Sequence, residues 1–138
     1  MSGNSSYPAG IQGFMSGEFN WEDDDFSVAA LGDDYTYSSA HADYSDISDF
    51  VIDSDALDDK ETVDSSFRAA TVSPGPVIPL DKTVKRLVVY RDALPDTAAS
   101  KLCFYIDRDV YGMLLNRPGS GTAVPIQWPS TGIYTIPS

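Results

Sequence analysis

Short apolar segments, each closely followed by Gly, Pro or Asp, are the feature that most constrains the fold of this 138-residue chain. Such segments predict strands, and the Gly and Pro residues between them predict turns. No segment shows a long helical period. We therefore expect a mainly β fold, a small single-domain antiparallel sandwich or barrel with one or two short helices and an N-terminal arm. The clearest segments are FSVAAL (26–31), KRLVVYRD (85–92), SKLCFYIDRD (100–109), AVPIQWP (123–129) and GIYTIPS (132–138).

The predicted organisation has two parts, an extended N-terminal arm over residues 1–10 and a single β-rich domain over residues 11–138. The first ten residues are mostly small and polar, so we expect them to have no core of their own. The remaining length is sufficient for one modest hydrophobic core. The 42% content of hydrophobic residues also favours a folded domain over a disordered acidic chain.

Two short helices are expected. Apolar residues spaced i, i+3 and i+4 predict a helical turn or two within residues 11–19, and Gly17 is suited to end that helix. Apolar residues spaced three and four apart predict a second short helix near residues 44–51. The Asp- and Ser-rich residues 53–59 are predicted to form a loop.

The apolar faces of these elements define a predicted core. Cys103 is the only cysteine and lies within an apolar segment, so we expect a buried, unreactive side chain and no intramolecular disulfide. The predicted core residues are Phe14, Trp21, Val28, Leu87, Val89, Phe104, Ile106, Trp128 and Ile133.

Charge is distributed unevenly along the chain. Residues 1–66 hold sixteen acidic residues and one basic residue, a formal charge of −15, whereas residues 67–138 hold five acidic and eight basic residues, a charge of +3; together they give the net −12. Nucleic-acid binding requires a basic surface, so we expect no nucleic-acid partner. No apolar segment approaches the length of a membrane span. The N-terminus lacks the pattern of a signal peptide, and synthesis in the cytoplasm is expected.

The four consecutive acids Glu22 to Asp25 suggest a metal site, an interaction surface or a solvated turn. Consecutive side chains on an extended segment alternate between faces and cannot all reach one ion. The segment from Asp53 to Asp58 begins like a calcium-binding loop but has leucine at the fifth position and no glycine at the sixth,. We therefore predict no metal site and no cofactor, with Glu22 to Asp25 forming a solvated turn that follows a buried Trp21.

His41 is the only histidine and lies among serines and aspartates. A catalytic triad depends on geometry that the fold must supply, and no nucleophile-elbow pattern is present. We interpret His41 as a capping or turn residue and predict no catalytic residues, so the chain is not expected to be an enzyme.

Eight tyrosines leave two interpretations open: they line sheet faces, or some contact a protein partner, where tyrosine is frequent. The residues predicted to contact a partner are Tyr7 and Pro8 of the arm, together with Lys82, Lys85 and Arg86.

The order of the motifs resembles a family of small structural proteins of tailed bacteriophages. That family has a helix ending in a Phe-x-x-Gly phrase, then a Trp, an acidic residue and a strand. A Tyr…His…Asp-Ile phrase, a strand ending in Tyr-Arg-Asp, an Ile-Asp strand and a final Trp with a Gly-Ile strand follow. The matching residues here are Phe14, Gly17, Trp21, Asp24, Tyr35 (or Tyr37), His41, Asp46, Ile47, Tyr90, Arg91, Asp92, Ile106, Asp107, Trp128, Gly132 and Ile133.

The resemblance implies a virion component without catalysis, and we expect a capsid decoration (cement) protein that binds the outer surface of the phage head in many copies. Its implied partners are the major capsid protein and copies of itself, after synthesis in the host cytoplasm. The acidic half would face away from packaged DNA, and the weakly basic half would face the shell. The alternatives are a neck or tail structural protein of the same virion and a small calcium- or carbohydrate-binding β module.

Overall fold

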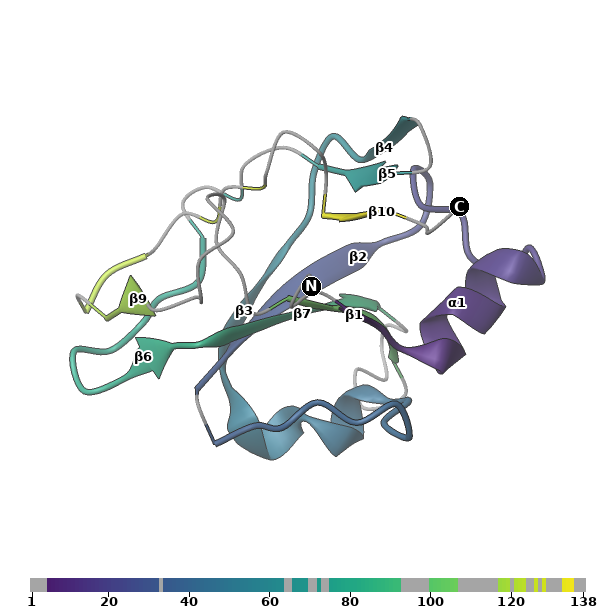
Figure 1. Cartoon of the computed structure of the whole chain (residues 1–138). Coiled ribbons are helices and arrows are strands. Elements are labelled where there is room, and N and C mark those ends of the chain that lie inside the picture. Colours follow the sequence, from purple (N-terminus) through teal and green to yellow (C-terminus); the bar gives the residue numbers. More distant parts are fainter. Residues whose placement is uncertain are drawn as a thin grey trace.

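The computed structural model describes residues 5–32, 34–63, 66–69, 72, 75–92, 100–106, 117–119, 121–123, 126, 128 and 133–135. Its largest element is a five-stranded sheet in which every pair of neighbours is antiparallel (Figure 1). The strand order is β1 (Ser5–Ser6), β8 (Lys101–Ile106), β7 (Arg86–Arg91), β2 (Phe26–Leu31) and β3 (Val51–Ala56). The strands expected within 26–31, 85–92 and 100–109 are therefore present.

β2 is an interior strand of this sheet, between β7 and β3, and is buried along its whole length. Its alternating side chains enter two separate hydrophobic clusters: Phe26 and Val28 on one face, Ala29 and Leu31 on the other. The nearly continuous apolar sequence of this strand follows from burial on both faces.

Two layers cover the two faces of the five-stranded sheet (Figure 1). A three-stranded sheet of β10 (Tyr134–Thr135), β5 (Ser66–Arg68) and β4 (Glu61–Val63) lies over one face. The other face is covered by residues 35–50, which include two 3₁₀ turns, η1 (Tyr44–Asp46) and η2 (Ser48–Phe50). A mainly β domain with short helices is therefore confirmed, and the described strands do not close into a barrel.

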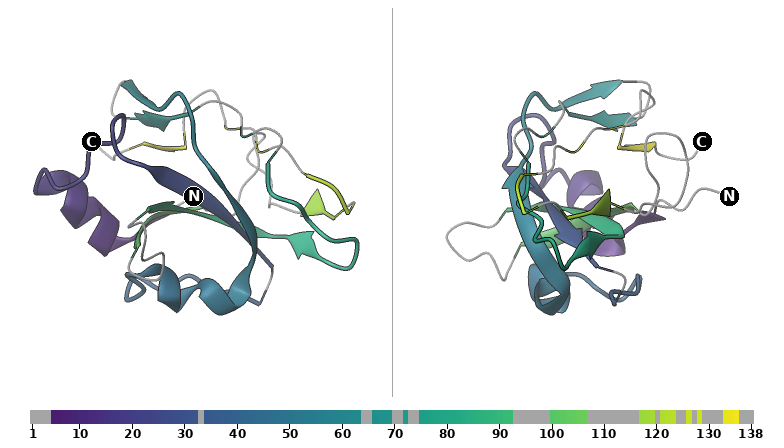
Figure 2. Two further views of the ribbon diagram at one scale, coloured as in Figure 1. Left: turned by 180° about the vertical axis from the view of Figure 1, so that it is seen from behind. Right: turned by 90° about the vertical axis from the view of Figure 1, so that its left-hand side faces the viewer.

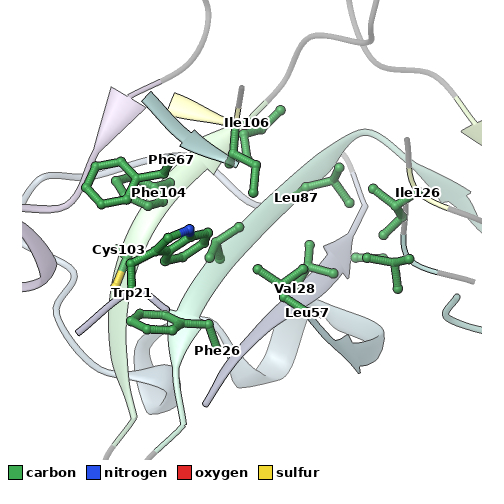
Figure 3. Close-up of a cluster of buried hydrophobic side chains, with 14 of the residues drawn as sticks. Trp21, Phe26, Val28, Leu57, Phe67, Leu87, Cys103, Phe104, Ile106 and Ile126 are labelled. Atoms are coloured by element: carbon green, nitrogen blue, oxygen red, sulfur yellow. The ribbon is translucent and has the colours of Figure 1, made fainter. Parts of the chain in front are cut away.

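The larger cluster is an aromatic core between the two sheets (Figure 3). The rings of Phe67 and Phe104 lie 4.8 Å apart, and Trp21 contacts Phe26 at 4.7 Å between ring centroids. Seven of the nine predicted core residues are buried, namely Trp21, Val28, Leu87, Val89, Phe104, Ile106 and Ile133. The other two, Phe14 and Trp128, are half-buried and pack against the same cluster.

The expectation of an extended arm over residues 1–10 is wrong for residues 5–10, and residues 1–4 lie outside the described residues. Ser5 and Ser6 pair with Tyr105 and Phe104 of β8, and helix α1 (Pro8–Met15) begins directly after Tyr7. The side chain of Tyr7 is completely buried. This segment contributes to the core because its partners on β8, nearly a hundred residues away in sequence, provide the apolar surface that it lacks locally.

The helix expected within 11–19 begins earlier than predicted, at Pro8, whose fixed φ suits the first helical turn,. Gly17 follows the last turn with φ +81°, as expected of a residue that ends a helix,. Met15, however, is 78% exposed.

The second expected helix, near 44–51, is formed only as the two 3₁₀ turns. The predicted loop over 53–59 is wrong, because residues 53–56 belong to β3. Strand β10 pairs with β5. In the 123–129 segment, Ala123 and Ile126 form isolated bridges to Val77 and Val72, and its other residues apart from Trp128 lie outside the described part.

The outer edge of β8 is covered by two segments from distant parts of the sequence. Strand β1 covers one end, and the amide of Tyr7 donates to the carbonyl of Cys103 at 2.9 Å. At the other end, the amide of Leu102 donates to the carbonyl of Ala42, and Asp43 bridges Lys101. The opposite edge of the sheet is β3.

A two-stranded sheet of β6 (Thr83–Val84) and β9 (Arg117–Pro118) extends from one end of the molecule, and α1 lies at the other (Figures 1 and 2). None of the described helices is long and apolar enough to cross a membrane.

Candidate functional site

The acidic residues 22–25 form a compact turn. The side-chain oxygen of Asn20 accepts hydrogen bonds from the amides of Glu22 and Asp23, both at 3.1 Å. The Asp24 carboxylate accepts one from the amide of Asn20 at 2.9 Å. These bonds hold the backbone of the turn locally and leave the side chains of Glu22, Asp23 and Asp25 exposed.

Trp21 and Asp23 lie as expected, with Trp21 3% exposed and Asp23 in the solvent. The prediction of a solvated turn is wrong for Asp24, which is half-buried. Its carboxylate forms an ion pair with Arg91 at 3.5 Å, and the Arg91 guanidinium lies over the Phe19 ring at 5.2 Å from the centroid. Asp24 is therefore partly shielded because it links the turn to the end of β7.

Metal ligation has no geometric basis among the residues that the structure describes, since no three His, Cys, Asp or Glu side chains gather into a group that could hold an ion. Asp53 lies in β3, and its carboxylate accepts a hydrogen bond from the amide of Val77 at 2.8 Å. That bond ties β3 to the segment leading into β6.

A chain of side-chain hydrogen bonds lies beneath the five-stranded sheet, on the face covered by residues 35–50. The hydroxyls of Tyr7 and Tyr35 are 2.7 Å apart, and the Tyr35 hydroxyl is 2.9 Å from Nδ1 of His41. The hydroxyl of Tyr37 donates to the carbonyl of Ser6 at 2.6 Å. These tyrosines line a sheet face and hold the N-terminal segment in place, which is one of the two interpretations left open by the sequence.

The hydroxyl groups in this chain of hydrogen bonds are held in the protonated form. Burial raises the pKa of Tyr7 far above its ordinary value, and the hydrogen bond to Tyr35 raises it further. Burial likewise raises the pKa of Tyr35. An activated nucleophile requires the opposite shift, toward the ionised form. His41, which also closes a turn through its amide on the carbonyl of Ser38, therefore has a hydroxyl partner that is held neutral.

Asp92 directly follows β7, and the pKa of its carboxyl group is raised. Its carboxylate accepts a hydrogen bond from the Ser27 hydroxyl at 2.5 Å. Burial raises the pKa of Asp92, the Ser27 bond lowers it, and the nearby charge of Asp25 raises it, with a net increase.

The end of the molecule that contains β6 and β9 carries exposed apolar residues. We call residues 77–84 and 117–119 the projection. Ile78 and Val84 are buried and anchor it to the core. Leu80, in contrast, is 79% exposed, and Val77 is 49% exposed. Single exposed apolar side chains are common on protein surfaces, whereas exposed apolar side chains that gather in a patch mark contact sites.

Four basic residues belong to the projection and its base: Lys82, Lys85 and Arg86, together with Arg117 of β9. Lys82 is exposed, while Lys85 and Arg86 are half-buried. The amide of Lys85 donates to the carbonyl of Leu31 at 2.9 Å, so these cations lie where β2 ends. The three basic residues that were predicted to contact a partner, Lys82, Lys85 and Arg86, therefore lie within the projection or directly after it.

The other predicted contact residues are placed differently. Tyr7 cannot contact a partner, because it is buried between β8 and Tyr35. Pro8 is exposed, at the first position of α1 and away from the projection. The sequence analysis missed Leu80 and Val77, although a leucine in the Pro- and Asp-containing segment VIPLDK is a recognisable indication of an exposed apolar turn.

The acidic turn and the projection lie at opposite ends of β2 and β7 (Figure 2). The amide of Asp92 donates to the carbonyl of Asp25 at one end, and Lys85 bonds Leu31 at the other. Strands of six residues span about 17 Å, which exceeds the Debye length of about 8 Å at physiological ionic strength. The two ends therefore present separate electrostatic surfaces.

Comparison with known proteins gives no further assignment: no protein-family model, curated protein or solved structure shows a significant match to this chain.

Proposed function

We propose that this chain is a non-enzymatic structural protein of a tailed-phage virion, a capsid decoration protein bound in many copies to the outer surface of the head. The motif order from Phe14 to Ile133 suggests the class of protein. The observation that carries the proposal is the separation of an acidic end from an exposed apolar and basic projection along the axis of β2 and β7.

This separation suits a protein that binds an assembly in one orientation. A small domain with an apolar and basic surface at one end and an acidic surface at the other can distinguish its two ends when it binds. The projection is the proposed contact surface, with the protein shell and neighbouring copies as its partners. The acidic end would keep packaged DNA and other polyanions away.

Rigidity supports the same proposal. The N-terminal segment, which begins the domain at β1, is tied to the rest by the Tyr7–Tyr35–His41 chain and by Tyr37. The projection is anchored separately by the buried side chains of Ile78 and Val84, and a contact surface fixed in advance loses less conformational entropy on binding than a flexible one.

The test is the composition of purified particles from a phage that encodes this chain. Quantitative mass spectrometry should find the chain in hundreds of copies per particle, because decoration follows the symmetry of the shell. A count of about a dozen or fewer would instead assign it to the neck or tail, where rings are small. Absence from purified particles would contradict the proposal.

A further inference from the structure

The three large apolar side chains exposed among the described residues lie at the two charged ends of the molecule. Val77 and Leu80 belong to the projection. Met15 ends α1 directly after Phe14, whose ring centroid lies 6.5 Å from that of Trp21, the residue before the acidic turn. Phe19, whose amide donates to the carbonyl of Gly13, folds the residues after α1 back onto the helix. Each end therefore combines an exposed apolar side chain with charges of one dominant sign.

The charges at the two ends are opposite. Residues 77–86 contain three basic residues and one acidic residue, a local charge of +2, whereas residues 15–25 contain five acidic residues and no basic one, a local charge of −5. At the acidic end only Asp24 has an ion-pair partner among the described residues, and Glu18, Glu22, Asp23 and Asp25 are exposed.

We propose that the partner of the projection is the acidic end of a second copy of this chain, so that copies associate head to tail. This inference rests on the proposed function for the use of the projection as a contact surface, and it adds the identity of the partner. Leu80 and Val77 would pack against Met15, and Lys82 would face Glu18 and Asp23. Complementary charge favours this register and disfavours two like ends meeting.

The chemistry favours a second copy over other partners. The projection and its base carry four basic residues, Lys82, Lys85, Arg86 and Arg117, beside Asp81, which is too little positive charge for a polyanion such as DNA. The partner of the projection should have an acidic surface that includes an exposed apolar side chain. The end of the molecule that contains Met15 has that composition. Net charges of −12 repel each other, but screening over about 8 Å leaves the local opposite charges dominant at contact.

The contact should be weak in isolation. One projecting turn against one helix end is a small interface, of the size that gives transient complexes. Copies held side by side on a shell would gain effective concentration, so that many weak contacts act together. A contact between unlike surfaces closes into a ring or extends as a chain.

The test uses the purified full-length protein and two neutralising variants. Leu80→Ser with Lys82→Gln changes the projection, and Met15→Gln with Asp23→Asn changes the acidic end. All four side chains are exposed, so both variants should melt as the wild type does. Lys60→Gln, outside the projection, changes the net charge by the same amount as Lys82→Gln and is the matched control.

Sedimentation velocity over roughly micromolar to millimolar concentrations should show reversible association of the wild type and of Lys60→Gln. Each double variant alone should associate at least tenfold more weakly. An equimolar mixture of the two variants should recover a dimer and nothing larger, because each keeps one intact surface.

Each contrary result overturns the inference. A monomeric wild type at all concentrations would leave the shell as the partner of the projection and would not affect the proposed function, which particle composition tests separately. Loss of association in only one of the two variants, or no recovery on mixing, would exclude a head-to-tail contact. Association unaffected by both variants would place the interface elsewhere.

Discussion

The hydroxyl of Tyr7 lies 2.7 Å from the hydroxyl of Tyr35, which in turn lies 2.9 Å from Nδ1 of His41. Tyr7 precedes α1 and Tyr35 follows β2, so this buried pair joins two segments that the sequence separates by 28 residues. The two hydroxyls are not equivalent, because that of Tyr35 contacts both Tyr7 and His41, whereas that of Tyr7 contacts Tyr35.

Tyr35→Phe should therefore destabilise the protein more than Tyr7→Phe. Removing the Tyr35 hydroxyl leaves the Tyr7 hydroxyl buried without its partner, at a cost of about 1–3 kcal/mol. Removing the Tyr7 hydroxyl leaves Tyr35 bonded to His41, at a cost of about 1 kcal/mol. Urea unfolding of both variants and of the double variant measures this. The double variant should lose less than the sum, and strict additivity would contradict the described pair.

Gly10→Ala should destabilise the protein strongly, because α1 approaches β8 at this position. A Cβ atom on Gly10 would lie 2.4 Å from the Leu102 carbonyl oxygen and 2.5 Å from the Cys103 Cα. Overpacking of this kind costs about 1–3 kcal/mol. Gln12→Ala, an exposed change in the same helix, is the control and should be close to neutral in thermal unfolding. Equal effects of the two would show that the close approach is absent.

Asp92→Asn should stabilise the protein at neutral pH. The folded-state pKa of Asp92 lies above its unfolded value, so the folded state binds the proton more tightly than the unfolded state. The stability that this group contributes is therefore lost as pH rises through the folded pKa. The gain should be on the order of 0.5 kcal/mol, since the carboxylate is only partly buried and solvent screens it. Asparagine can still accept the Ser27 bond.

The measurement for Asp92 is the difference in unfolding free energy between variant and wild type at pH 3 and pH 7. The advantage of the variant should be larger at pH 7. An exposed Asp23→Asn variant corrects for the general effect of removing a negative charge. A larger advantage at pH 3 would reverse the sign and contradict the shift.

The thiol of Cys103 should be inert in the folded protein. Its side chain is fully buried, and burial raises the pKa of the thiol above its ordinary value, which suppresses the reactive thiolate. Labelling with a disulfide reagent should be slow in native buffer and complete within minutes in denaturant. Rapid labelling of the native protein would mean that the Cys103 region opens readily.

The sequence was sufficient to predict β2, β7 and β8, because their apolar residues are contiguous and their burial follows from composition. It was not sufficient for β3, where Asp53 and Asp55 suggested a loop; the strand forms because its backbone pairs with β2. Edge strands require fewer apolar residues than central ones, so composition predicts them poorly.

The candidate site was predictable only in part. Lys82, Lys85 and Arg86 were identified from local charge, which neighbouring residues show directly. The burial of Tyr7 depends on Tyr35 and Cys103, and no local pattern around Tyr7 indicates those contacts. The acidic turn and the projection lie at opposite ends of the molecule because β2 pairs with β7, and no local sequence pattern indicates that pairing.

The covered edge of β8 limits how copies of this protein can meet. Because β1 and residues 42–44 occupy that edge, no incoming strand can add there. The opposite edge of the sheet is β3, which bears Asp53 and Asp55. The charges of these two residues would repel an identical strand. Continuous cross-β growth from one copy to the next is therefore disfavoured at both margins of the sheet. Crowded copies can remain separate folded units that touch through side chains, and each can leave its neighbours without unfolding.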